Sequence, residues 1–164
     1  MKLRALFTIA IIALLFGCKK NNPGDQIIIE PPNTTFIRGL NNGAAWNGDP
    51  KANFVTGTDS VFVQGSNWFD VLQLKFKFDG APGKYTLTSD QWNYYWTFGE
   101  VIIRAKYYLR TDVASTVTVT SYDPTSKIMV GTFDLHLLKT AGTITTDPQN
   151  IDFTNGTFTV RLLQ

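Results

Sequence analysis

The stretch 72–78 reads Leu72-Gln73-Leu74-Lys75-Phe76-Lys77-Phe78, with apolar and polar residues in strict alternation. Successive side chains of a β-strand point to opposite faces, so the apolar residues share one face and the polar residues share the other. Such a strand buries its apolar face and leaves its polar face in water. The stretch therefore predicts a half-buried strand of an antiparallel sheet.

The same alternation returns in three later stretches of the chain. The residues that share an apolar face are Val101, Ile103, Ala105, Tyr107 and Leu109, then Met129, Phe133, Leu135 and Leu137, then Phe158, Val160 and Leu162. Turn sequences such as Asn41-Asn42-Gly43 and Asn155-Gly156 lie between the stretches, and no segment after residue 17 keeps a helical period for three turns. We expect an all-β fold, an antiparallel β-sandwich of roughly eight to ten strands, with a calycin- or lipocalin-like β-barrel as the alternative.

Residues 1–17 predict a lipoprotein signal peptide, expected as a helix that is cleaved off. Lys2 and Arg4 precede an apolar run from Ala5 to Gly17 that only Thr8 interrupts. The run fits the apolar core of a secretory signal and is too short to cross a bilayer, which needs roughly 20 helical residues. It ends in Leu15-Phe16-Gly17-Cys18, which resembles the lipobox of bacterial lipoproteins. The resemblance implies lipidation at Cys18, the single cysteine of the chain.

Residues 18–32 predict the lipidated cysteine and a flexible tether, followed by a single β-domain over residues 33–164. The tether, Lys19–Pro32, is polar and rich in turn residues. It would span on the order of 20 Å as a coil and nearer ~45 Å when extended. The anchor implies the outer membrane of the cell envelope. Lys19 and Lys20 stand where some surface-exported lipoproteins carry acidic residues, which favours the periplasmic face slightly over the cell surface.

The net charge of the chain comes from its leader. The full sequence has 15 basic and 13 acidic residues, and Lys2 and Arg4 are lost with residues 1–17. The mature chain therefore has 13 basic against 13 acidic side chains. This balance argues against a nucleic acid as its partner.

Four motifs in the predicted domain resemble those of an uncharacterised family of small lipoproteins from Bacteroidetes-type bacteria. The motifs are Phe36-Ile37-Arg38-Gly39 with Ala45-Trp46, Gly83-Lys84-Tyr85-Thr86-Leu87, Gly131-Thr132-Phe133-Asp134-Leu135, and Thr154-Asn155-Gly156-Thr157-Phe158-Thr159-Val160. As an ordered set they cover most of residues 36–163. The resemblance implies a β-domain and an envelope location, and it implies no activity.

The residue types that commonly serve in catalysis or metal binding form no recognisable motif in this sequence. His136 is the single histidine and falls on the polar face of its strand, with no nucleophile and orienting acid near it in sequence. A zinc site would need further His or Cys ligands. Of the 11 Asp and 2 Glu residues, most aspartates stand in turn contexts, where the side chain caps its own backbone. We expect a solvated surface histidine, no catalytic site, no metal and no cofactor.

Aromatic residues concentrate in the stretch Trp92-Asn93-Tyr94-Tyr95-Trp96-Thr97-Phe98, beside a Trp68-Phe69 pair. In a strand, Trp92, Tyr94 and Trp96 share a face and Tyr95 points the other way. Exposed tryptophan and tyrosine rings stack on sugars and peptides, whereas buried ones build β cores. Both interpretations stay open. If the face is exposed, the predicted contact residues are Trp92, Tyr94, Tyr95 and Trp96.

The sequence thus predicts a non-catalytic, lipid-anchored binding or accessory domain of the cell envelope that contacts a glycan or a peptide through its aromatic strip. The alternative is a structural or assembly lipoprotein that binds another envelope protein through a sheet edge. In addition, Asp59-Ser60-Val61 resembles a short acceptor motif for O-glycosylation, which predicts a glycan on Ser60.

Overall fold

The computed structural model describes residues 35–88, 93–98, 102–142 and 144–163. The strands are β1 (Phe36–Asn41), β2 (Ala44–Phe54), β3 (Ser60–Ser66), β4 (Asp70–Lys77), β5 (Gly83–Thr86), β6 (Tyr94–Phe98), β7 (Ile102–Leu109), β8 (Thr116–Asp123), β9 (Ile128–Gly142) and β10 (Asn150–Leu163). The described ranges contain no helix of the length and hydrophobicity that crossing a membrane requires. The predicted signal peptide, Cys18, the tether and Trp92 lie outside the described residues.

All ten strands belong to one sheet, in the order β1-β10-β2-β3-β4-β6-β7-β9-β8-β5. Further pairings join β1 to β2 and β9 to β10. The pairings between strands are antiparallel, apart from a short parallel contact in which Leu162 and Leu163 of β10 lie beside Ala52 and Asn53 of β2. The expected all-β antiparallel fold, with a strand number in the expected range, is confirmed.

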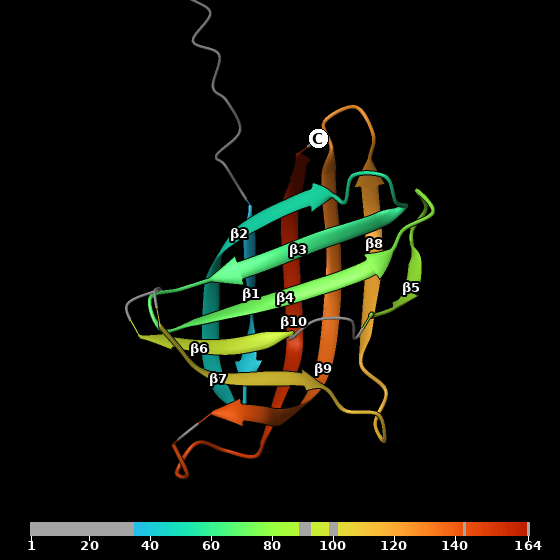
Figure 1. The fold of residues 1–164 in the computed structure, drawn as a ribbon. Coiled ribbons are helices and arrows are strands. Elements are labelled where there is room, and N and C mark those ends of the chain that lie inside the picture. The colour runs from blue at the N-terminus through green and yellow to red at the C-terminus, as the bar shows by residue number, and fades with distance from the viewer. Residues whose placement is uncertain (1–34, 89–92, 99–101, 143, 164) are drawn as a thin grey trace, which may run out of the picture. The chain divides into compact units, whose positions relative to one another are not determined.

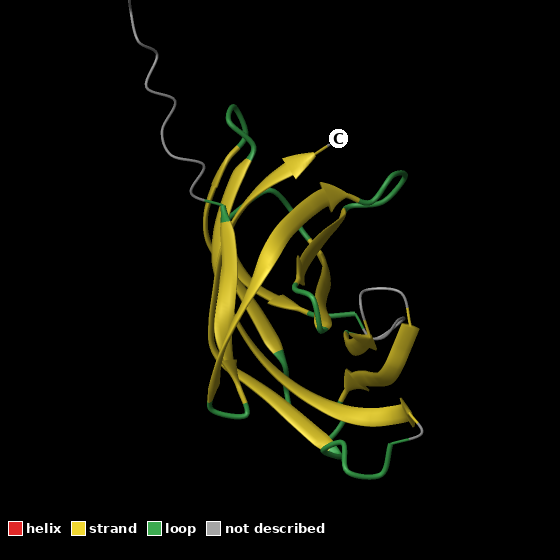
Figure 2. Ribbon diagram, turned by 90° about the vertical axis from the view of Figure 1, so that its left-hand side faces the viewer, coloured by secondary structure: helices red, strands yellow, loops and turns green. Residues whose placement is uncertain are grey.

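Two long strands carry the sheet from one layer into another. β2 pairs with β1 through its first half and with β3 through its second half. β9 pairs with β8 and β10 through its first part and with β7 near its end. Figure 1 shows β3, β4, β6 and β7 crossing in front of β1, β8, β9 and β10, and Figure 2 shows the two layers from the side. Strands that pass from layer to layer are typical of orthogonal packing. Since β1 pairs with both β2 and β10, and β10 pairs with β9, the pairings run through β1-β2-β3-β4-β6-β7-β9-β10 and return to β1. The two layers are therefore parts of one sheet that closes on itself, as in the barrel expected as the alternative.

The core lies between the two layers and is filled by the faces that the alternation predicted. The first stretch contributes Leu72, Leu74 and Phe76, which are fully buried. The other buried residues from the predicted faces are Ala105, Tyr107, Met129, Phe133, Leu135, Leu137, Phe158, Val160 and Leu162. Among the described residues of these faces, Leu109 is partly buried and Ile103 is 41% exposed. The register of the β6–β7 pair shifts between Ala105 and Ile103, so the alternation of faces is interrupted before Ile103. Val101 lies outside the described residues.

The Gly-Thr-Phe motifs of β9 and β10 pair directly with each other. Gly131 lies opposite Phe158, and Phe133 lies opposite Gly156. A Cβ atom on Gly131 would lie 2.4 Å from the Phe158 ring, and one on Gly156 would lie 2.5 Å from the Phe133 ring. Each phenylalanine therefore covers the glycine of the neighbouring strand. The spacing of the two motifs is explained by this reciprocal packing.

Candidate functional site

Tyr94, the centre of the predicted aromatic strip, is a core residue. Its side chain is fully buried and packs edge-on against Phe153, with ring centroids 5.1 Å apart. It also packs against Tyr107 at 5.6 Å. Buried aromatic side chains of this size dominate the energetics of β cores. Tyr94 therefore stabilises the fold and offers no surface to a ligand.

The hydroxyl of Tyr94 belongs to a polar cluster that is enclosed in the core. It donates to Asp70 Oδ2 over 2.9 Å, and it accepts hydrogen bonds from Trp96 Nε1 at 2.6 Å and Asn41 Nδ2 at 3.0 Å. The second carboxylate oxygen, Asp70 Oδ1, accepts from Trp46 Nε1 at 2.5 Å. A buried carboxylate is tolerated when both of its oxygens are hydrogen-bonded, as they are here.

The surroundings shift the pKa values of this cluster upward. Burial raises the pKa of the Asp70 carboxyl, although hydrogen bonds from Trp46, Tyr94 and Asn67 act in the opposite direction. Burial also raises the pKa of the Tyr94 hydroxyl, and the neighbouring Asp70 charge adds to this effect. Because both groups face core side chains, the cluster is structural: it fixes β2, β4 and β6 to one another.

Trp96 is partly buried, and Arg104 lies against one face of its ring. The guanidinium of Arg104 lies over the Trp96 ring, 5.1 Å from its centroid. Arg104 is in turn held by a hydrogen-bonded ion pair with Asp147, whose side chain is only 1% exposed. The ring face under Arg104 is engaged in a cation–π contact and is not open for stacking on a sugar.

The burial of Tyr94 argues against a ligand contact at that residue, whereas Trp96 keeps part of its surface exposed and its ligand contact stays a prediction. Tyr95 points to the opposite face, is half-buried and has a raised pKa because of that burial. Trp92 is not among the described residues. The alternative interpretation of the strip, as core, therefore holds for Tyr94, and ligand binding by Tyr95 and Trp92 stays a prediction.

The exposed aromatic residues lie instead on the turn between β3 and β4. Trp68 is 64% exposed and Phe69 is 69% exposed. Asn67 fixes this turn, because its Oδ1 accepts hydrogen bonds from the backbone N–H groups of Phe69 at 2.8 Å and Asp70 at 3.0 Å. The backbone of Asn67 also donates to the carbonyl of Asp70 over 2.9 Å. The two rings are therefore displayed on a rigid turn.

Further apolar side chains lie next to this turn. The backbone N–H of Thr97 in β6 donates to the carbonyl of Phe69 over 2.7 Å, and Thr97 pairs with Ile103 of β7. Ile102, at the start of β7, is 64% exposed. We call five large exposed apolar residues, from the β3–β4 turn, the start of β7 and the segment after β9, the apolar patch: they are Trp68, Phe69, Ile102, Ile103 and Ile144.

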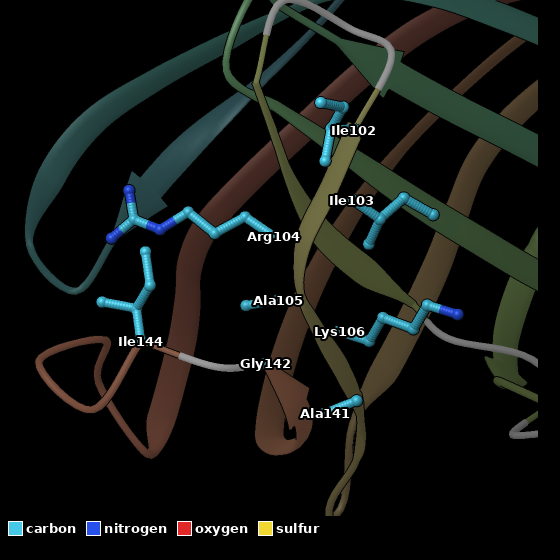
Figure 3. A pocket seen from close by; sticks show the side chains of 8 residues that line it. All are labelled: Ile102, Ile103, Arg104, Ala105, Lys106, Ala141, Gly142 and Ile144. Carbon is cyan, nitrogen blue, oxygen red and sulfur yellow. The ribbon is translucent and has the colours of Figure 1, made fainter.

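A groove of about 460 Å³ lies between the isoleucines of the apolar patch. Its walls are formed by Ile102, Ile103, Arg104, Ala105, Lys106, Ala141, Gly142 and Ile144. Figure 3 shows these side chains, with Ile102 and Ile103 on β7 and Ile144 on the segment that follows β9. The groove is therefore mainly apolar, with the cationic side chains of Arg104 and Lys106 as its charged groups.

Ile144 is held in place by the polar contacts of its own segment. The ammonium group of Lys139 donates to the carbonyl of Ile144 over 2.8 Å. The segment is attached to β7 through the Arg104–Asp147 ion pair and through a hydrogen bond from the Tyr107 hydroxyl to the carbonyl of Pro148, 3.1 Å long. The groove is thus bounded on both sides by anchored backbone.

His136 is more engaged than the sequence predicted. Its Nδ1 lies 2.8 Å from Asp152 Oδ1, across the β9–β10 pair, and its side chain is 23% exposed. The backbone N–H of His136 donates to Ser115 Oγ over 2.8 Å. The partners lie 16 and 21 residues away, so no local pattern could reveal them. Within the described ranges, no group of three or more His, Cys, Asp or Glu side chains could hold a metal ion.

Ser60, the predicted glycosylation site, begins β3 and is 6% exposed. Its backbone carbonyl accepts a hydrogen bond from Val55, and its N–H donates to the Thr58 hydroxyl. A glycan acceptor has to reach the surface of a folded domain. The burial of Ser60 therefore argues against this modification in the folded protein.

Comparisons with known proteins give a family for the chain. A family model described as "Domain of unknown function (DUF6252)" matches residues 33–160, which includes nine of the strands in full and most of β10. No curated protein and no solved structure matches the chain. Since the matched region spans most of the sequence, the chain belongs to the DUF6252 family.

Proposed function

We propose that the chain is a non-catalytic binding or accessory domain of the bacterial cell envelope, anchored by lipid at Cys18. The lipobox sequence Leu15-Phe16-Gly17-Cys18 supports the anchor, and the charge balance of the mature chain disfavours a nucleic acid partner. The expected location is the outer membrane, with the periplasmic face slightly favoured.

The apolar patch is the observation that carries the binding role. Exposed large apolar side chains that cluster on a folded domain commonly mark a contact surface. Trp68 and Phe69 are displayed on a turn that three hydrogen bonds fix, so little conformational entropy is lost when they are covered. This patch takes the place of the strip at Tyr94 and Trp96 as the proposed contact surface.

Photo-crosslinking in the envelope tests this role. A photoreactive phenylalanine analogue replaces Trp68 in one variant of the full chain and Leu163 in a control variant. Leu163 is a fair control because it is 61% exposed and lies at the end of β10, outside the patch. We expect an adduct of increased mass, whether with a glycan, a peptide, a protein or a lipid, from position 68. Equal adducts from both positions, or none from position 68, would refute a contact role for the patch.

The anchor has a separate test. Replacing Cys18 by Ser removes the thiol that would carry the lipid. We expect the Cys18→Ser chain to lose incorporation of radiolabelled palmitate. Continued labelling of this variant would contradict lipidation at Cys18.

A second candidate function is assembly with an envelope protein through a sheet edge. Among the described strands, β5 is the one that pairs with a single other strand, β8. It is four residues long, and the chain directly after it is attached to β4 by the Phe76–Leu87 bridge and by a 2.8 Å hydrogen bond from Thr88 to Lys75. So short an edge offers few backbone groups to a partner strand, and the first candidate is better supported.

A further inference from the structure

We propose that the partner of the apolar patch is the lipid–water interface of the membrane that holds Cys18. This inference rests on the proposed function, since it names the partner of the same surface. It places the β3–β4 turn and the first residues of β7 against the bilayer.

The composition of the patch fits a bilayer interface. Tryptophan is favoured at the depth of lipid headgroups because its ring is amphipathic. Phe69 follows Trp68 in the turn, and the isoleucines of β7 lie one strand beyond β6, whose Thr97 is hydrogen-bonded to Phe69. Apolar side chains on a protruding element can enter the boundary between headgroups and acyl chains, and binding strength grows with the apolar area buried.

The groove presents no negative charge that would repel an anionic membrane surface. Arg104 and Lys106 line the groove, and its lining contains no acidic residue. The charge of Arg104 is compensated by its ion pair with Asp147, whose side chain is 1% exposed, so the absence of acidic residues from the lining is the observation that favours an anionic surface. A bilayer with anionic lipids attracts cationic side chains that lie close to its surface.

The same groove fits a sugar less well. Sites for small polar ligands combine an apolar wall with several polar groups that converge on the ligand. Here the walls are three isoleucines, two alanines and a glycine, with only Arg104 and Lys106 as polar side chains. A surface built in this way can bury apolar area but offers few hydrogen bonds to hydroxyl groups.

The tether allows the apolar patch to stay on the membrane even with a low affinity of the patch for lipid. The chain from Cys18 to Thr35 can extend to roughly 55 Å, so a lipid on Cys18 would keep the domain within reach of the bilayer. A tether of this length raises the effective concentration of the domain at the surface to the millimolar range. Even weak binding of the patch would then hold the domain on the membrane.

Vesicle co-sedimentation of the chain from residue 18 onward, with Cys18→Ser so that no lipid is attached, tests the inference. The probes are vesicles of phosphatidylethanolamine with phosphatidylglycerol, used at millimolar lipid. We expect the parent chain to sediment with them and Trp68 to shift its emission to shorter wavelength. Truncating both rings, as Trp68→Ala with Phe69→Ala, should weaken binding about tenfold or more, because each ring buries apolar area.

Two further variants complete the experiment. Ile102→Asn, at a residue that is 64% exposed, should also weaken binding, whereas Leu163→Ala, outside the patch, should bind like the parent. Failure of the parent to bind vesicles, or equal binding by the Trp68/Phe69 variant, would overturn the inference. If position 68 crosslinks to a protein or a glycan in the envelope while the vesicles stay unbound, the proposed function stands and the lipid partner is wrong.

Discussion

Asp70 connects buried polar side chains of the core through hydrogen bonds to its carboxylate. One oxygen of its carboxylate accepts the Trp46 indole N–H, and the other accepts the Tyr94 hydroxyl. These donors come from β2 and β6, so a single side chain on β4 satisfies polar groups of two other strands. If the acceptor is removed, the buried donors have lost their hydrogen bonds to water and gain none in the protein, which lowers the stability of the fold.

Asp70→Ala should therefore lower the free energy of unfolding by about 2–4 kcal/mol, since two buried donors lose their partner. Urea denaturation followed by fluorescence measures the change. Asp49→Ala is the matched control, because Asp49 is exposed and its loss should change stability by less than about 0.5 kcal/mol. Equal effects of the two substitutions would contradict the role assigned to Asp70.

The raised pKa of Asp70 predicts the direction of a pH effect. Its folded-state pKa lies above the ordinary value of 3.8 because burial disfavours the charged form. The stabilising contribution of Asp70 is therefore greatest below this value and falls as the pH rises through the folded-state pKa. Relative to Asp70→Asn, which does not titrate there, the parent should lose stability as the pH rises above 3.8. A difference that grows in favour of the parent as the pH rises would show that the shift has the opposite sign.

Residue-scale patterns could not predict which aromatic side chains are buried. Alternation places Tyr94 and Trp96 on one face, but it does not tell whether that face points to the core. The answer depends on Asp70, which lies 24 residues before Tyr94, and on Arg104, which lies against one face of the Trp96 ring. Trp68 and Phe69 carry a local signal, since the adjoining Asn67 is a typical turn residue.

At the scale of elements, the pairing of β9 with β10 explains the Gly-Thr-Phe motifs. Both strands carry the motif, and their antiparallel register sets each glycine against the other strand's phenylalanine. The glycines are required for space, because a Cβ atom would overlap the facing ring. The sequence showed the motifs in order, but their mutual pairing is a long-range property that only the fold reveals.

Gly131→Ala should thus lower the free energy of unfolding by about 1–3 kcal/mol through overpacking against Phe158. Thermal unfolding measures the effect. Gly83→Ala is the control, since the nearest atom to a Cβ at Gly83 lies at an ordinary 3.7 Å. Combining Gly131→Ala with Phe158→Leu should give less than the sum of the two single effects. Strict additivity would mean that the ring does not meet the new methyl group.

The path of the long strands β2 and β9 could not be predicted from the alternation of apolar and polar residues. Alternation predicted that strands of one apolar face would occur at 72–78, 129–138 and 158–162, and the structure confirms these faces as core. It could not show that β2 and β9 each pass from one layer to the other, because both halves of a corner strand obey the same period. The two layers and their continuity therefore follow from pairings between distant segments.

At the scale of the whole domain, the apolar patch combines three segments that lie far apart in the sequence. The β3–β4 turn, the start of β7 and the segment after β9 supply its members. None of these three segments alone shows from its sequence that a patch forms. The sequence predicted an aromatic strip around Tyr94, whereas the fold exposes the aromatic side chains of Trp68 and Phe69.

The most direct test of the account measures which tryptophan faces the membrane. The full lipidated chain is reconstituted into vesicles whose acyl chains are brominated, since bromine quenches indole emission at short range. We predict that the brominated chains quench the emission and that Trp68→Phe removes more of this quenching than Trp96→Phe, because Trp68 is 64% exposed and Trp96 lies under Arg104. Equal quenching of the parent and Trp68→Phe chains would contradict the assignment of the apolar patch as the contact surface.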